Sequence, residues 1–154
     1  MKKMLLILCF INFLHADLME QGKGVVSFKG GIVSVHEDNY IIAGGNIGWL
    51  LIDGLKLGIG YERWFDRVPN VDKLSLDLVY YLPISERVRP YLGGFVANNY
   101  LDSVDAGVSE GFKIGILFSS EVASVGLEWN QEYYEKCIFG CERAYPMVVL
   151  GIGF

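Results

Sequence analysis

Apolar and polar residues alternate along most of this chain, and the alternation is clearest in the last ten residues, YPMVVLGIGF. One side of that extended segment is apolar and consists of Val148, Leu150, Ile152 and Phe154. Successive side chains of a β-strand point to opposite faces, so a period of two predicts a strand whose two faces differ in polarity. Residues 72–82, 108–118 and 122–133 alternate in the same way.

The same pattern, fainter in four further segments, predicts an all-β chain of eight strands. We place these strands at residues 24–35, 40–50, 55–65, 72–82, 88–98, 108–118, 122–133 and 145–154. The 19 glycines of the chain disfavour helices, and no segment has a sustained apolar stripe at helical spacing. In segment 88–98 the pattern leaves open whether Leu92 with Val96 or Tyr91 with Phe95 forms the apolar face.

The expected connections between these strands alternate in length. Short connections fall at residues 52–54, 83–87 and 119–121, and longer ones at 36–39, 66–70, 99–107 and 135–144. Short turns at one end and long loops at the other are typical of transmembrane β-barrels, whose strands are also about ten residues long. We therefore predict an antiparallel, up-and-down, eight-stranded transmembrane β-barrel with both chain ends on the short-turn side.

The composition of the two faces indicates which one points outward. Small and charged residues share one face, and an eight-stranded barrel has room inside only for packed side chains. The charges on that face would form a lumen network of Lys29, Lys56, Glu62, Lys73, Asp77, Lys113, Glu128 and Glu132. The apolar face carries aromatic residues suited to membrane interfaces, namely Trp49, Tyr80, Phe118 and Phe154 near the short turns and Trp129 and Tyr133 near the long loops. The alternative is a soluble periplasmic barrel that has the apolar face inside and carries a lipid.

The first residues, 1–16, predict export of the protein. Lys2 and Lys3 precede an apolar run, and Ala16 is a small residue suited to cleavage. This is the pattern of a secretory signal peptide, because the run is too short for a transmembrane helix. Residues 17–154 then form a single barrel domain. A chain with 52% hydrophobic and 20% charged residues is neither a disordered protein nor a nucleic-acid-binding one.

These features together carry a family resemblance. The signal peptide, the glycine-rich strands, the segment RPYLGG at 89–94 and the terminal VLGIGF resemble the small eight-stranded outer-membrane barrels, such as the transmembrane domain of OmpA and the OmpX-type proteins. The resemblance implies a monomeric protein of the Gram-negative outer membrane, surrounded by lipid and lipopolysaccharide. It also implies that the barrel-assembly machinery recognises the C-terminal strand, which ends on Phe154.

Few residues suggest specific chemistry, and we expect no cofactor. Cys137 and Cys141 in the last long loop are suited to a disulfide in an exported protein, whereas their spacing without a nearby histidine makes a weak metal site. His36 with its acidic neighbours is the candidate for catalysis, although a histidine in a polar loop is the simpler interpretation. The lumen charges are expected to form a salt-bridged core, with an ion path as the alternative.

The sequence therefore predicts a non-catalytic outer-membrane β-barrel whose loops contribute to surface interaction or to envelope integrity. Two alternatives from other classes remain. One is an outer-membrane enzyme that modifies lipid A through His36, and the other is the soluble lipid-carrying barrel.

Overall fold

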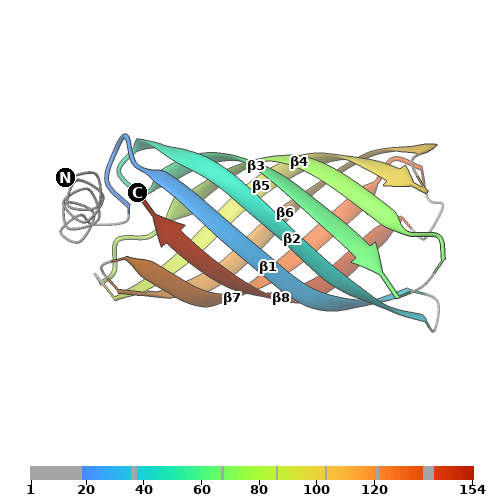
Figure 1. The fold of residues 1–154 in the computed structure, drawn as a ribbon. Coiled ribbons are helices and arrows are strands. Elements are labelled where there is room, and N and C mark those ends of the chain that lie inside the picture. The colour runs from blue at the N-terminus through green and yellow to red at the C-terminus, as the bar shows by residue number, and fades with distance from the viewer. Residues whose placement is uncertain are drawn as a thin grey trace, which may run out of the picture.

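The computed structural model describes residues 19–35, 38–66, 68–85, 87–102, 104–120, 122–136 and 141–154, which form one closed β-barrel (Figure 1). Its antiparallel strands follow one another around the barrel in chain order. They are β1 (Gly24–Val35), β2 (Asp38–Ile52), β3 (Leu55–Phe65), β4 (Val71–Tyr81), β5 (Val88–Leu101), β6 (Val104–Ser119), β7 (Ala123–Tyr134) and β8 (Glu142–Gly153). The predicted eight-stranded, antiparallel, up-and-down barrel is confirmed. No helix in the described ranges is long and apolar enough to cross a membrane.

Pairing of β1 with β8 closes the barrel and brings the end of the chain beside the first strand (Figure 1). Gly24 and Phe154 exchange two backbone hydrogen bonds of 2.9 Å. The segment that precedes β1 packs against the same end, where the Met19 carbonyl accepts a hydrogen bond of 3.0 Å from the Gly54 N–H. The Met19 side chain is buried. The short-turn end of the barrel is therefore covered by residues that lie just before β1.

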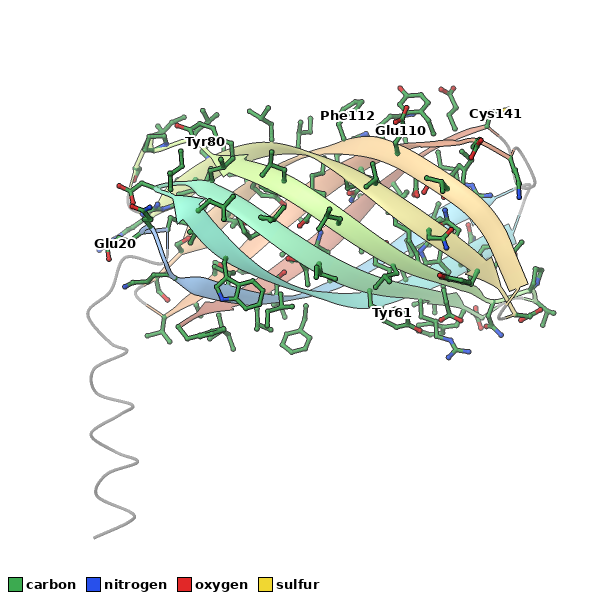
Figure 2. All side chains as sticks on the ribbon, turned by 90° about the horizontal axis from the view of Figure 1, so that it is seen from above. Glu20, Tyr61, Tyr80, Glu110, Phe112 and Cys141 are labelled. Carbon is green, nitrogen blue, oxygen red and sulfur yellow. The ribbon has the colours of Figure 1, made fainter. Side chains whose placement is uncertain are left out.

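Inward and outward positions alternate as the sequence predicts, and the apolar side chains point outward. In β4, for example, Lys73 and Asp77 are 2% exposed, whereas Leu74 and Leu78 are 49% and 47% exposed. All eight strands place large apolar side chains on the outer wall (Figure 2). A soluble lipid carrier needs the opposite arrangement, with an apolar lumen and a polar wall. The structure therefore contradicts that alternative.

The structure also settles the face assignment of β5. Tyr91 and Phe95 are buried in the lumen, whereas Leu92 and Val96 are about half exposed on the outer wall. A tyrosine and a phenylalanine thus occupy inward positions beside Gly93, where a Cβ would meet Val79 Cγ2 at 2.9 Å. Sequence alone left this choice open because both faces of the segment are apolar.

The predicted alternation of short and long connections is wrong at two places. β1 ends at Val35 and β2 begins at Asp38, so half of the predicted connection 36–39 belongs to β2. β5 ends at Leu101 and β6 begins at Val104, so most of the predicted connection 99–107 belongs to strands. Polar residues on both faces hid these strand ends, since backbone pairing continues beyond the apolar belt. A register shift at Asn99 and the positive φ of 102° at Gly107 accommodate the second extension.

Glycines on the inward face make room for lumen side chains. A Cβ on Gly58 would lie 2.8 Å from Asn46 Oδ1 and against the Asp77 carboxylate, and a Cβ on Gly48 would lie 2.9 Å from Lys56 Cγ. These distances are too short for a real Cβ, so a larger residue would displace the charged side chains. The predicted reason for inward glycine, a narrow and filled lumen, agrees with these contacts.

Replacement of an inward glycine should therefore be far more damaging than replacement of an outward one. We expect Gly58→Val to lower the free energy of unfolding by about 1–3 kcal/mol through overpacking. The matched control is Gly30→Val, because a Cβ at that outward glycine would meet no atom closer than 3.8 Å. Urea unfolding in lipid vesicles measures both variants, and equal destabilisation would contradict the filled lumen.

Candidate functional site

The buried charges of the lumen form three connected clusters, each organised around one carboxylate. In the first, Asp77 of β4 accepts a 2.8 Å hydrogen bond from Lys113 Nζ and lies 4.0 Å from Lys56 Nζ. Asn46 connects the same groups, because its amide donates to Asp77 at 3.2 Å and its oxygen accepts from Lys56 at 2.7 Å. We call this set the Asp77 cluster. One carboxylate thus balances two lysines that come from β3 and β6.

The second cluster surrounds Glu128 of β7. Lys29 Nζ donates to Glu128 Oε1 at 2.6 Å, and the Tyr91 hydroxyl donates to Oε2 at 2.9 Å. The Asn130 amide adds a third hydrogen bond of 3.2 Å. Lys29 lies on β1 and Glu128 on β7, so this ion pair spans β8 and connects strands that are not neighbours in the wall. The inward side chains alone make this connection.

The third cluster lies nearer the long loops and surrounds Glu132. Its carboxylate accepts hydrogen bonds from Lys73 at 3.0 Å, from the Ser109 hydroxyl at 2.5 Å and from the Tyr145 hydroxyl at 3.1 Å. Lys73 Nζ also lies 3.2 Å from Glu62 Oε2. All of these side chains are buried. Removal of any one of them would leave a buried polar atom without its present partner.

Apolar residues enclose these clusters toward both ends of the lumen. The group at the short-turn end contains Met19, Val25, Leu50, Val79, Tyr81, Tyr91, Leu117 and Val149. The group toward the long loops contains Val33, Tyr40, Ile42, Trp64, Val71, Tyr145 and Met147. Charges between two apolar layers are shielded from water, so their pairing matters more than it would on the surface.

All eight charged residues that the sequence assigns to the lumen are buried there, and the structure adds further interior residues. Among the described residues, Arg89 and Arg143 are also buried, so basic side chains outnumber acidic ones in the lumen. The Arg143 guanidinium lies 5.2 Å from the Trp64 ring and 4.9 Å from the Tyr134 ring. Arg143 was missed because the predicted strand began at residue 145, and Arg89 because the faces of β5 were ambiguous. Continued alternation past the apolar residues was the signal for Arg143.

The six predicted interface aromatics all lie exposed on the outer wall, but one of them is not where we expected it. The set comprises Trp49, Tyr80, Phe118, Trp129, Tyr133 and Phe154. Trp129 lies near the middle of β7, opposite Ile114 and Pro146, rather than near the long-loop end. The predicted strand, residues 122–133, nearly coincides with β7, so only Tyr133 of the two rings lies near its long-loop end.

Polar outward-facing residues gather toward the long-loop end of the apolar belt, among exposed apolar residues such as Phe65 and Val108, and we call them the polar rim. The rim consists of Ser34, Asn39, Arg63, Asp72, Asn98, Glu110, Gln131 and Glu142. Several members satisfy one another locally. The Ser34 hydroxyl donates to Asn39 at 2.7 Å, and Arg63 Nε lies 3.7 Å from Asp72, which also accepts from the Tyr61 hydroxyl. The rim therefore resembles the polar boundary expected at a lipid head-group region.

The fold matches solved structures of small bacterial barrels. The N-terminal β-barrel domain of Pseudomonas aeruginosa OprF has a TM-score of 0.70 and 20% identity, covering 87% of this chain and 98% of that one. Neisserial surface protein A (NspA) has a TM-score of 0.67 and 13% identity over 86% and 96%, and the outer membrane protein OprG of P. aeruginosa has 0.58 and 11% over 88% and 97%. The chain has the fold of the small outer-membrane β-barrels. No protein-family model matches it, and no curated protein matches it.

The residues with possible chemistry lie mostly outside the described ranges of this outer-membrane barrel fold. His36, on which the lipid A-modifying alternative depends, is one of them. The predicted signal peptide, residues 1–16, also lies outside the described ranges. Cys141 is in a disulfide, whereas Cys137 lies outside the described residues. No group of three or more histidine, cysteine or acidic residues in the described ranges is arranged to hold a metal ion.

The Asp77 cluster predicts a large effect for removal of one charge. Asp77→Asn leaves Lys56 and Lys113 without their carboxylate, and we expect it to lower the free energy of unfolding by about 3–5 kcal/mol. Adding Lys113→Met should restore part of this loss, because it removes one uncompensated charge. Urea unfolding in lipid vesicles is the measurement. The matched control is Asp72→Asn on the outer rim, which we expect to lower the free energy of unfolding by under about 1 kcal/mol. A loss as large as that of Asp77→Asn would show that burial does not set the cost of removing a carboxylate.

The disulfide between Cys137 and Cys141 stays a prediction that thiol labelling can check. These are the only cysteines after the expected signal peptide. We expect the purified protein to react with a maleimide only after a reductant is added, because a bonded sulfur is not a nucleophile. Cys137→Ser supplies the control, since it frees the Cys141 thiol for labelling. Rapid labelling of the untreated protein at both positions would contradict the bond.

Proposed function

We propose that this protein is a non-catalytic outer-membrane β-barrel that contributes to surface interaction or envelope integrity through its extracellular loops. The observation that carries the proposal is the filled lumen. Three ion-paired clusters between two apolar groups occupy the space where a channel or a carried ligand would lie. A rigid interior of this kind leaves the outer wall and the loop end as the surfaces that meet other molecules.

The outer wall supports a location in the outer membrane, in contact with lipid and lipopolysaccharide. Large apolar side chains surround the barrel between the short turns and the polar rim, as a lipid-facing wall requires. Closure leaves no unpaired strand edge along the wall for another chain to join, which supports a monomer. The matching fold of OprG, an outer membrane protein, supports the same location.

The C-terminal strand supports recognition by the barrel-assembly machinery. Val148, Leu150 and Ile152 of β8, and Phe154 directly after it, are each about half exposed on the same outer face. This strand closes the barrel against β1. An apolar strand that ends on an exposed aromatic residue is therefore available to an assembly factor before closure and faces lipid afterwards.

Cell fractionation with gel mobility tests the location and the closed barrel together. We expect the protein in isolated outer membranes, with different mobility in unboiled and boiled samples, because the closed hydrogen-bonded barrel resists detergent until it is heated. The purified protein should give no steady conductance in planar bilayers. Recovery mainly from the soluble periplasm would contradict the location, and steady conductance would contradict the filled lumen.

Lipid A analysis of a deletion strain tests the absence of catalysis. We expect the acyl composition of lipid A to be the same with and without the protein. A change that the wild-type gene reverses, but a His36→Ala variant does not, would instead favour the lipid A-modifying alternative. The comparison needs equal amounts of both proteins in the outer membrane.

A further inference from the structure

The outer wall has a hollow of about 590 Å³ on its lipid-facing side. Gly94 of β5 lines it, facing outward between Leu78 on β4 and Phe112 on β6. A Cβ at Gly94 would meet only the Gly111 carbonyl oxygen, at 3.7 Å, so the missing side chain leaves open space. The apolar lining also includes Leu57, Leu76, Phe95, Val96 and Tyr133.

An exposed carboxylate lies at the edge of this hollow that is nearer the long loops. Glu110 is opposite Val96 on β5 and Tyr133 on β7, one outward position nearer the long loops than Phe112. Glu110 and Phe112 both project from the outer wall (Figure 2). Because Glu110 belongs to the polar rim, its carboxylate lies at the expected level of lipid head groups. The hollow extends from it toward the short-turn end, at the expected level of acyl chains.

The charge of Glu110 has no counterpart on the described part of the protein. Elsewhere on the rim, Arg63 pairs with Asp72. Glu110 makes no hydrogen bond or ion pair with another described residue, and Glu142, on the other side of Tyr133, adds a second exposed carboxylate. This sector of the rim is therefore acidic, next to a lipid-facing hollow. A positively charged group is the complement that this arrangement attracts.

We propose that this hollow binds one membrane lipid whose primary ammonium head group pairs with Glu110 beside Tyr133 and whose acyl chain lies over Gly94. The proposal rests on the proposed membrane location. An ammonium group has three N–H donors, which one carboxylate and one phenol oxygen can accept. A divalent cation that bridges Glu110 to a lipid phosphate is the competing arrangement, and its remaining oxygen ligands would come from phosphate and water. The EDTA comparison below distinguishes it from direct pairing with an ammonium group. Within the described ranges, no group of three or more potential metal ligands comes together.

A lipid-retention experiment with the folded protein tests this site. The protein is reconstituted in nanodiscs with equal amounts of phosphatidylethanolamine and phosphatidylglycerol of the same acyl chains, and retained lipids are counted by native mass spectrometry after release. We expect wild type to retain phosphatidylethanolamine about tenfold more than phosphatidylglycerol, as one charge-assisted hydrogen bond predicts. Glu110→Gln should abolish this preference, and Tyr133→Phe should weaken it.

Matched controls separate charge and shape. Asp72→Asn removes a rim carboxylate that already has an arginine partner, so it should keep the wild-type preference. Gly94→Leu fills the hollow and should lower the retention of both lipids, whereas Gly30→Leu adds the same side chain at another outward glycine and should not. These pairs distinguish the proposed site from general effects on the lipid-facing surface.

Three results would overturn the proposal. They are equal retention of both lipids by wild type, an unchanged preference in Glu110→Gln, and a preference for phosphatidylglycerol that EDTA removes, which would indicate a bridging cation. Gel mobility of each sample, unboiled and boiled, shows whether the barrel is folded. A folded protein without lipid preference contradicts only this site. Wild type that never shows the mobility shift contradicts the membrane barrel, and the lipid site with it.

Discussion

Backbone hydrogen bonding is the constraint on which the rest of this structure depends. A strand that faces lipid cannot leave its N–H and C=O groups unpaired, because the hydrocarbon offers them no partner. Pairing of β1 with β8 removes the two free edges that eight strands in a row would have. Closure then assigns one face of every strand to the lumen and the other to the outside. The chemistry of the interior follows from this division.

The lumen of an eight-stranded barrel is narrow. The chain fills it by placing glycines, which have no side chain, next to residues with long side chains. Glycines such as Gly58 leave space that Asn46 and Asp77 occupy. Charged groups placed in that space lose their water, so each carboxylate is positioned to contact lysines from distant strands. Glu128 reaches Lys29, and Asp77 reaches Lys113. Pairs of this kind add little net stability but make wrong arrangements costly.

The outer wall faces lipid, so it is apolar where the lumen is charged. The polar rim at its long-loop end indicates where the protein is suited to specific recognition. Most of the wall is apolar, which suits a fluid lipid environment. At the polar rim the neighbouring strands satisfy one another, as Arg63 and Asp72 do. Glu110, beside the hollow at Gly94, and Glu142, across Tyr133, depart from that rule. A rigid interior and a mostly self-satisfied rim thus leave the loops and this sector as the surfaces suited to specific recognition.

The sequence by itself determined the all-β class, the number of strands and the inward or outward direction of nearly every strand residue. A period of two is a local property, so it can be read without knowing which strands meet. It failed where both faces have similar polarity, as in β5, where Tyr91 and Phe95 proved to be inward, and at strand ends beyond the apolar belt. Only the tertiary structure decided the partners of Asp77, Glu128 and Glu132 and the position of Glu110 above the hollow at Gly94. These depend on register between strands, and register comes from backbone pairing around the whole closed barrel.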